Sequence, residues 1–378
     1  MIEHASEPVL AEEAQLGRLK ESSIRLILRL QDASGAYPAS PTFSAYKGYS
    51  WFRDGAFIAD AVSAAGEIDS ATRFFDWCGR ILDSRSSTIA AMIERFDAGQ
   101  PVADTEMLPA RFTFDGVEGD DDWWDFQLDG YGTWLWAVAE HARRHGLSLD
   151  RWQDAIVLTV DYLERFWDRP CYDWWEEHPE KRHVSTLGCI SAGLSAVLDV
   201  LDEPRRALAK SAVERIRDLV VAEGVTAGHL AKWLGSTEVD ASLAAVVYPL
   251  NVFPASEDIG MNTVRAVDDQ LSEVGGVHRY LADTFYGGGQ WPLLSCMLGL
   301  AWNASGDRTR ALDLLRSAAA TATHDGYLPE QVGTHLLAPA SEQEWIDRWG
   351  TVATPLLWSH AMFIRLAVEL GLEGGERE

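Results

Sequence analysis

The chain has 378 residues, and 47% of them are hydrophobic, which is enough for a full core and excludes a disordered protein. Its net charge of −26 excludes the basic surface with which proteins bind nucleic acid or anionic membranes. An acidic surface suits a neutral substrate. The 16 tryptophans mostly fill the core of a helical protein, but some offer aromatic faces on which a sugar can stack.

Apolar residues spaced i, i+3, i+4 and i+7 recur along most of the chain and predict helices. The predicted helices span residues 10–31, 52–66, 68–98 (one helix or two), 130–146, 149–168, 186–202, 204–223, 241–248, 259–275, 290–305, 307–323 and 353–371. Alternation typical of strands is rare. The sequence therefore predicts an all-α protein.

Long loops follow alternate helices. They span residues 33–51, 99–129, 169–185, 224–240, 276–289 and 324–352. In a ring of helix pairs, such loops gather at one end, where a rigid scaffold supports a site built from loops. A helical solenoid is the alternative, but no period of 30–45 residues repeats. We expect one (α/α)6 barrel that comprises residues 1–378 as a single domain.

The cysteines and the N-terminus bear on the compartment. Four widely spaced cysteines form no CxxC and no pattern typical of zinc sites, so a reducing compartment is favoured. The first residues lack the features of a secretion signal, and no apolar run reaches the ~18 residues of a membrane span. We expect a cytoplasmic protein with a small oligosaccharide as its partner, without a nucleic-acid partner, membrane segment, metal or cofactor.

The stretch YDWWEE (172–177) has two adjacent carboxylates, Glu176 and Glu177, after two tryptophans. Large apolar rings desolvate a carboxyl group and raise its pKa, which suits a general acid for a glycosidic oxygen. Such an acid needs a second, distant carboxylate. Glu330 in the loop 324–352 is our candidate, although a single loop glutamate is more often merely solvated.

Other loop motifs suggest sugar binding. Arg53 and Asp54 together suit neighbouring hydroxyls of one sugar ring, although a helix N-cap aspartate beside a surface arginine is equally plausible. Trp123 could wall a pocket, and the adjoining acidic run does not match an EF-hand. Arg279 and Tyr280 precede a Gly-Gly-Gly turn that lacks the GK[ST] of a phosphate loop. No GxSxG or HExxH motif supports serine or metal hydrolysis.

Five motifs in order resemble glycoside hydrolase family 15, the glucoamylase-type family. They are YSWFRDGAF (49–57), QLDGYG (127–132), YDWWEE (172–177), GGGQWPL (287–293) and LPEQV (328–332). Each motif alone is weak, but together they cover nearly the whole chain. The resemblance implies an (α/α)6 barrel and the release of β-glucose, with inversion, from the non-reducing end of an α-glucoside.

The resemblance also implies roles for single residues. Glu176 would be the general acid and Glu330 the general base that activates water. The sugar in the terminal subsite would be bound by Arg53, Asp54, Glu177, Arg279 and Tyr280, and lined by Trp51, Trp123, Trp175 and Trp291.

Two departures from the family weigh against starch as the substrate. The β-sandwich domain of prokaryotic glucoamylases and the starch-binding module of fungal ones have no counterpart here. Lys47 also stands near the position where fungal members have a tyrosine beside the base. We expect hydrolysis of short α-1,6 glucosides such as isomaltose.

Several alternatives stay open. Within the hydrolases they are an α-1,4 glucoamylase and an α,α-trehalase. Outside them, a sugar epimerase would need paired histidines, for which only His183, His229 and His324 lie in loops, and a non-catalytic protein would bind sugar without releasing glucose.

Overall fold

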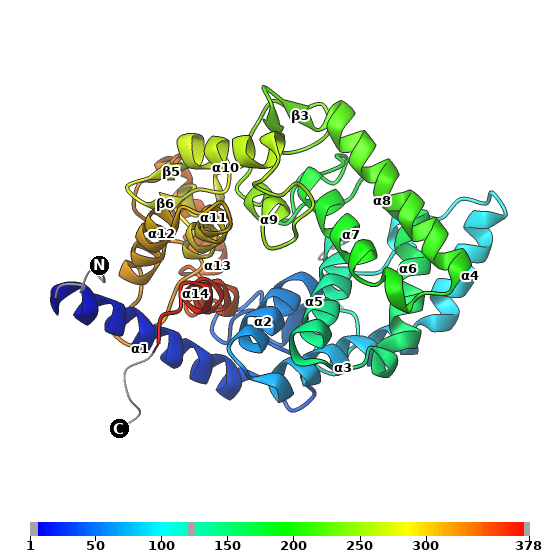
Figure 1. Ribbon diagram of the computed structural model, residues 1–378, viewed down its shortest axis with the longest axis horizontal. Helices are drawn as coiled ribbons and strands as arrows, with labels where there is room; N and C mark the ends of the chain where they lie inside the picture. Colours follow the sequence, from blue (N-terminus) through cyan, green and yellow to red (C-terminus); the bar gives the residue numbers. More distant parts are fainter. Residues whose placement is uncertain (1–6, 120–125, 374–378) are drawn as a thin grey trace, which may run out of the picture.

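The computed structural model of the chain describes residues 7–119 and 126–373, so the predicted site residue Trp123 lies outside the described residues. The fold is an (α/α)6 barrel in which an inner ring of helices is enclosed by an outer ring (Figure 1). The all-α prediction is confirmed. Within these two ranges, no helix has both the length and the apolar character needed to cross a membrane.

The inner ring contains, in order around the barrel, α2 (Phe52–Ala64), α5 (Asp129–His145), α7 (Val184–Ala196), α9 (Leu243–Val247), α11 (Pro292–Ala304) and α14 (Leu357–Glu369). Each of these helices packs against the next, and α14 packs against α2, which closes the ring. Inner helices are surrounded on nearly all sides. Accordingly, most of their residues are apolar or small around the whole circumference, and α2 also buries charged residues.

The outer ring contains α1 (Glu7–Leu30), α3 (Ile68–Ser84), α6 (Gln153–Phe166), α8 (Glu203–Glu223), α10 (Asp258–Leu271) and α12 (Arg308–Ala320). These helices are amphipathic: α12, for example, buries Ala311, Leu314, Leu315 and Ala318 at a spacing of i, i+3, i+4 and i+7. The segment 68–98 forms two helices, because α3 is followed after Arg85 by α4 (Ser86–Asp97), which packs against α6.

Glycine permits a close helix contact in the inner ring. A Cβ atom on Gly193 of α7 would lie 2.2 Å from the carbonyl oxygen of Gly132 in α5. Only a residue without a side chain allows two backbones to approach in this way. The first turn of α5 and the last turn of α7 are thereby held together.

The long connections predicted from the sequence lead from each outer helix to the next inner helix. They carry three short antiparallel pairs: β1 (Tyr49–Trp51) with β2 (Arg111–Thr113), β3 (Val225–Thr226) with β4 (His229–Leu230), and β5 (Ser272–Glu273) with β6 (Gly276–Val277). The last connection also contains α13 (Glu342–Trp349), which the sequence did not predict. These elements are too short to show a periodic pattern.

Candidate active site

A cavity of about 700 Å³ lies at the barrel end that carries the long connections. This volume is within the range of roughly 300–1,000 Å³ that is usual for small-molecule sites. The lining comes from four connections, α1–α2, α6–α7, α10–α11 and α12–α14, and from the first turns of α2 and α14. The predicted residues that line it are Trp51, Arg53, Asp54, Trp175, Glu176, Glu177, Arg279, Trp291 and Glu330.

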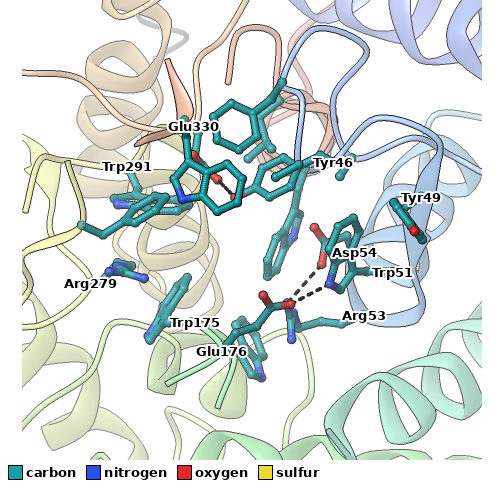
Figure 2. A pocket seen from close by; sticks show the side chains of 18 of the residues that line it. Tyr46, Tyr49, Trp51, Arg53, Asp54, Trp175, Glu176, Arg279, Trp291 and Glu330 are labelled. Atoms are coloured by element: carbon teal, nitrogen blue, oxygen red, sulfur yellow. Dashed lines mark hydrogen bonds and ion pairs between the residues drawn. The ribbon is translucent and has the colours of Figure 1, made fainter. Parts of the chain in front are cut away.

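Glu176 and Glu330 enter this pocket from opposite sides (Figure 2). Trp51 Nε1 donates a hydrogen bond to Glu176 Oε1 at 2.7 Å. Tyr46 Oη donates a hydrogen bond to Glu330 Oε1 at 2.8 Å. Both donors belong to the α1–α2 connection, so one loop orients the two carboxyl groups.

The carboxyl group of Glu330 is buried, with only 3% of the residue exposed. Burial raises its pKa to about 7, and the negative charges of Asp54 and Glu176 act in the same direction. The hydrogen bond from Tyr46 and the charge of Arg279 partly oppose this shift. Among the described residues, none donates a hydrogen bond to Glu330 Oε2, so this oxygen can accept one from a substrate or water.

Glu176 projects from a tightly folded loop. Its φ angle is 62°, in the left-handed region that residues other than glycine seldom adopt. Asp173 holds the loop, because its Oδ1 accepts hydrogen bonds from the backbone N–H groups of Trp175 and Glu177, both at 2.9 Å. The residues on either side of Glu176 are therefore fixed by one carboxylate.

Arg53 and Asp54 form one charged edge of the pocket. Arg53 Nη2 lies 3.3 Å from Asp54 Oδ2, and Nη1 binds Asp129 Oδ2 at 3.1 Å and Gln127 Oε1 at 2.7 Å. Burial raises the pKa of Asp54 to about 6; Arg53 lowers it, and the Glu176 charge raises it. Since Arg53 is buried and Asp54 lies inside α2, the alternative of an N-cap beside a surface arginine is wrong.

Glu177 and Arg279 form a second charged edge. Arg279 Nη2 lies 3.4 Å from Glu177 Oε1, and Arg279 Nε donates to Asp283 Oδ2 at 2.8 Å. Tyr280 is not part of the cavity lining; its hydroxyl donates to Glu177 Oε2. Direct binding of substrate by Tyr280 therefore stays a prediction. What the structure shows is the hydrogen bond by which Tyr280 holds the Glu177 carboxylate.

Several lining residues were not predicted from the sequence. The pocket also includes Phe43, Tyr46, Tyr49, Trp174, Phe285, Trp358 and, from α13, Trp345, Arg348 and Trp349. The expectation that Lys47 stands in place of a tyrosine beside the candidate base is wrong, because the adjacent Tyr46 supplies a phenol that hydrogen-bonds to Glu330. The sequence does contain the tyrosine, at position 46, one residue before Lys47.

The three loop histidines do not form a catalytic pair. His183 is buried and contacts the carbonyl oxygen of His178, and His229 contacts that of Leu230. His324 is exposed. None of the three is among the described residues that line the cavity, which disfavours an epimerase. Across the described ranges, no group of three or more His, Cys, Asp or Glu side chains is arranged to hold a metal ion.

The family model for glycosyl hydrolases family 15 matches residues 13–368. The chain belongs to this family. It is therefore a glycoside hydrolase, as the sequence motifs predicted.

Known proteins resemble the chain over nearly its whole length. The isomaltose glucohydrolase of Kribbella flavida is 55% identical over 362 residues, which cover 95% of this chain and 94% of that protein. A glycosidase variant solved in complex with glucose is 53% identical, with a TM-score of 0.95 and coverage of 98% of this chain and 100% of that one. A bacterial glucoamylase complexed with acarbose is 19% identical, with a TM-score of 0.74 over 94% of this chain and 56% of that one, and shares the fold.

Proposed function

We propose that the protein releases β-glucose from the non-reducing end of short α-1,6 glucosides, isomaltose and isomalto-oligosaccharides, with inversion at the anomeric carbon. One observation carries the mechanism: Glu176 and Glu330 enter one pocket from opposite sides (Figure 2). The similarity to an isomaltose glucohydrolase over 95% of the chain supports the linkage. The four free, buried cysteines agree with action in the cytoplasm.

Glu176 acts as the general acid and Glu330 as the general base in this proposal. Glu176 protonates the departing glycosidic oxygen while Glu330 removes a proton from a water that attacks the opposite face of the sugar. Inversion needs room for that water, so inverting enzymes hold the two carboxyl groups roughly 6.5–9.5 Å apart. Glu176 loses one proton and Glu330 gains one, so the reaction is balanced. Proton exchange with solvent then returns both groups to their starting protonation states.

The raised pKa of Glu330 suits its role as base. A base is most effective when its pKa lies near the working pH, and burial sets the pKa of Glu330 at about 7. The hydrogen bond from Tyr46 occupies Oε1, which leaves Oε2 to accept the proton of the attacking water.

The two charged edges hold the terminal glucose. Arg53 with Asp54, and Arg279 with Glu177, each present fixed donors and acceptors at the cavity wall. Because their side chains are already locked by ion pairs, little conformational entropy is lost when hydroxyl groups bind. Trp175 and Trp291, whose ring centroids are 5.6 Å apart, supply the apolar face against which the sugar ring packs.

Helix α13 forms part of the pocket wall. It contributes Trp345, Arg348 and Trp349, and the Arg348 guanidinium lies over both tryptophan rings, 5.6 and 5.2 Å from their centroids. A wall of this kind leaves room for a short leaving group. It favours isomaltose over a long glucan.

The test uses a Glu330→Ala variant and a panel of substrates. We expect Glu330→Ala to fold normally and lose nearly all turnover, because a general base contributes on the order of 10²–10⁴-fold. Asp325→Ala, an exposed carboxylate in the same connection, is the matched control and should keep full activity. Retained turnover in Glu330→Ala would exclude the base assignment.

Proton NMR and a substrate panel test the stereochemistry and the linkage. Early product should be the β-anomer of glucose, and early α-glucose would show retention instead. Glucose release from isomaltose should exceed that from maltose, trehalose, dextran and starch. Faster glucose release from trehalose or maltose would contradict the proposed α-1,6 specificity. Binding of these sugars without release of glucose would contradict the proposed hydrolase activity.

A further inference from the structure

Lys232 is a buried lysine beneath the Glu176 loop that the mechanism above does not use. Its side chain is 1% exposed. It comes from the α8–α9 connection, from which none of the described residues lines the pocket. Lys232 Nζ lies 2.7 Å from Asp240 Oδ2, 3.5 Å from Asp173 Oδ2 and 3.3 Å from the centroid of the Tyr280 ring.

Each partner of Lys232 holds a different part of the sugar site. Asp240 Oδ2 accepts a hydrogen bond from Trp175 Nε1 at 3.0 Å. Tyr280 donates its hydroxyl hydrogen to Glu177. Asp173 accepts the backbone N–H groups on both sides of Glu176. The ammonium group therefore lies where three supports of one loop meet.

We propose that Lys232 is a positioning residue for the general acid: its ion pair with Asp173 Oδ2 holds that side chain at the place where Asp173 fixes the left-handed backbone of Glu176. This inference rests on the proposed role of Glu176. In this proposal the buried charge of Lys232 serves catalysis as well as stability. The loop that Lys232 supports contains Glu176, which donates a proton to the departing oxygen.

Electrostatics explains why the cation is needed. Two buried carboxylates, Asp173 and Asp240, lie within 4 Å of Lys232 Nζ. Burial acts to raise the pKa of Asp240, but the charge of Lys232 and the hydrogen bonds from Lys232 and Ser242 outweigh it, so the pKa is lowered. Without the cation, Asp173 Oδ2 would keep neither an ion pair nor a hydrogen bond among the described residues.

An Asp173 side chain without this ion pair would hold the loop poorly, because its Oδ1 would no longer be fixed beside the two backbone N–H groups that it binds. The φ angle of 62° at Glu176 is a strained conformation, which persists only while the surroundings enforce it. Loss of Lys232 should therefore let the loop relax and move the acid away from the glycosidic oxygen.

The test compares two substrates that differ in their need for an acid. The oxygen of isomaltose must be protonated as it departs, whereas the fluoride of α-glucosyl fluoride leaves as a weakly basic anion. For Lys232→Met we expect kcat on isomaltose to fall by about 10²-fold, the cost of a misplacement near 1 Å, and kcat on α-glucosyl fluoride to change little. An equal loss on both substrates, or no loss, would overturn the inference.

Two reference variants make the outcome specific. Glu176→Gln should show the same selective loss, and if it does not, the acid assignment itself fails. If Glu176→Gln is selective and Lys232→Met is not, only the role of Lys232 fails. Arg365→Met removes a buried cation that pairs with Asp60 and Glu369 far from the pocket, so any loss there should be equal for both substrates.

A double variant keeps the comparison valid if Lys232→Met does not fold. Lys232→Met combined with Asp240→Asn restores the net charge of the cluster while the cation beside Asp173 stays absent. It should fold and still lose isomaltose hydrolysis selectively. Lys181→Met, an exposed lysine in the α6–α7 connection, should behave as the wild type on both substrates.

Discussion

Tyr46 and Glu330 are 284 positions apart in the sequence, and the Tyr46 hydroxyl donates a hydrogen bond to Glu330 Oε1 at 2.8 Å. The contact joins the first long connection of the barrel to the last. It fixes the orientation of the carboxyl group, so that the plane of the proposed base is set before substrate binds.

The variant Tyr46→Phe should lower kcat on isomaltose by about 10- to 100-fold, because a hydrogen bond to a charged group contributes on the order of 1.5–3 kcal/mol. The Tyr46 hydrogen bond lowers the pKa of Glu330, so its removal should also shift the acidic limb of the rate profile to higher pH. Kinetics from pH 4 to 9 measure both effects. Tyr37→Phe, which removes a buried hydroxyl bound to Ser70, should leave that limb unchanged.

The activity of the free enzyme should fall as the pH drops below about 7. Burial raises the pKa of Glu330 to about 7, so the protonated form, which cannot take a proton from water, accumulates below that value. The pH dependence of kcat/KM reports the groups of the free enzyme. A value of kcat/KM that stays flat down to pH 5 would contradict this assignment of the base.

The same shift predicts a pH-dependent cost in stability. Glu330 has an ordinary pKa of 4.5 and a folded pKa of about 7. Below pH 4.5, Glu330 is protonated in both the folded and the unfolded protein. As the pH rises, the unfolded chain releases the proton first, so the free energy of unfolding decreases until the pH exceeds 7. Glu330→Gln should therefore be more stable than the wild type at pH 8, on the order of 3 kcal/mol, since one pKa unit corresponds to ~1.4 kcal/mol.

Denaturation in urea at pH 5 and at pH 8 measures this difference. The advantage of Glu330→Gln should grow with pH. An advantage that is equal at the two pH values would mean that the carboxyl group is not titrating in this range.

His360 should matter for the base although it does not line the pocket. Its Nε2 accepts the backbone N–H of Leu328 at 2.9 Å, so the ring proton is on Nδ1 and is donated to Ser23 Oγ at 2.8 Å. Burial lowers the pKa of His360 to about 3, which keeps the ring neutral. The backbone two residues before Glu330 is thus tied to α14.

The variant His360→Leu should leave the Leu328 N–H without an acceptor and cost about 1–3 kcal/mol of stability, together with a lower kcat. His360→Gln, which can still accept a hydrogen bond, should recover part of both. Urea denaturation and kinetics on isomaltose provide the readouts. Unchanged kcat in His360→Leu would show that the base is held by other contacts.

The sequence was most informative where a motif carries chemistry. Glu176 and Glu330 each stand in a recognisable stretch, and helix periodicity predicted both rings of the barrel. Tyr46 was missed because the position one residue later was considered. Helix α13 was missed because its eight residues are too few to show a clear period. Lys232 was missed because a lysine in a loop is usually a surface charge, and only the folded chain buries it.

Every described residue of the cavity lining comes from connections at one end of the barrel or from the first turns of two inner helices. Of the residues that the structure describes, none in the short turns at the other end contributes to it. Substrate specificity can therefore change in evolution through replacement of one pocket-lining connection at a time, while the two rings of helices stay the same. Tethering the enzyme through its opposite end should likewise leave the mouth free for sugar to enter.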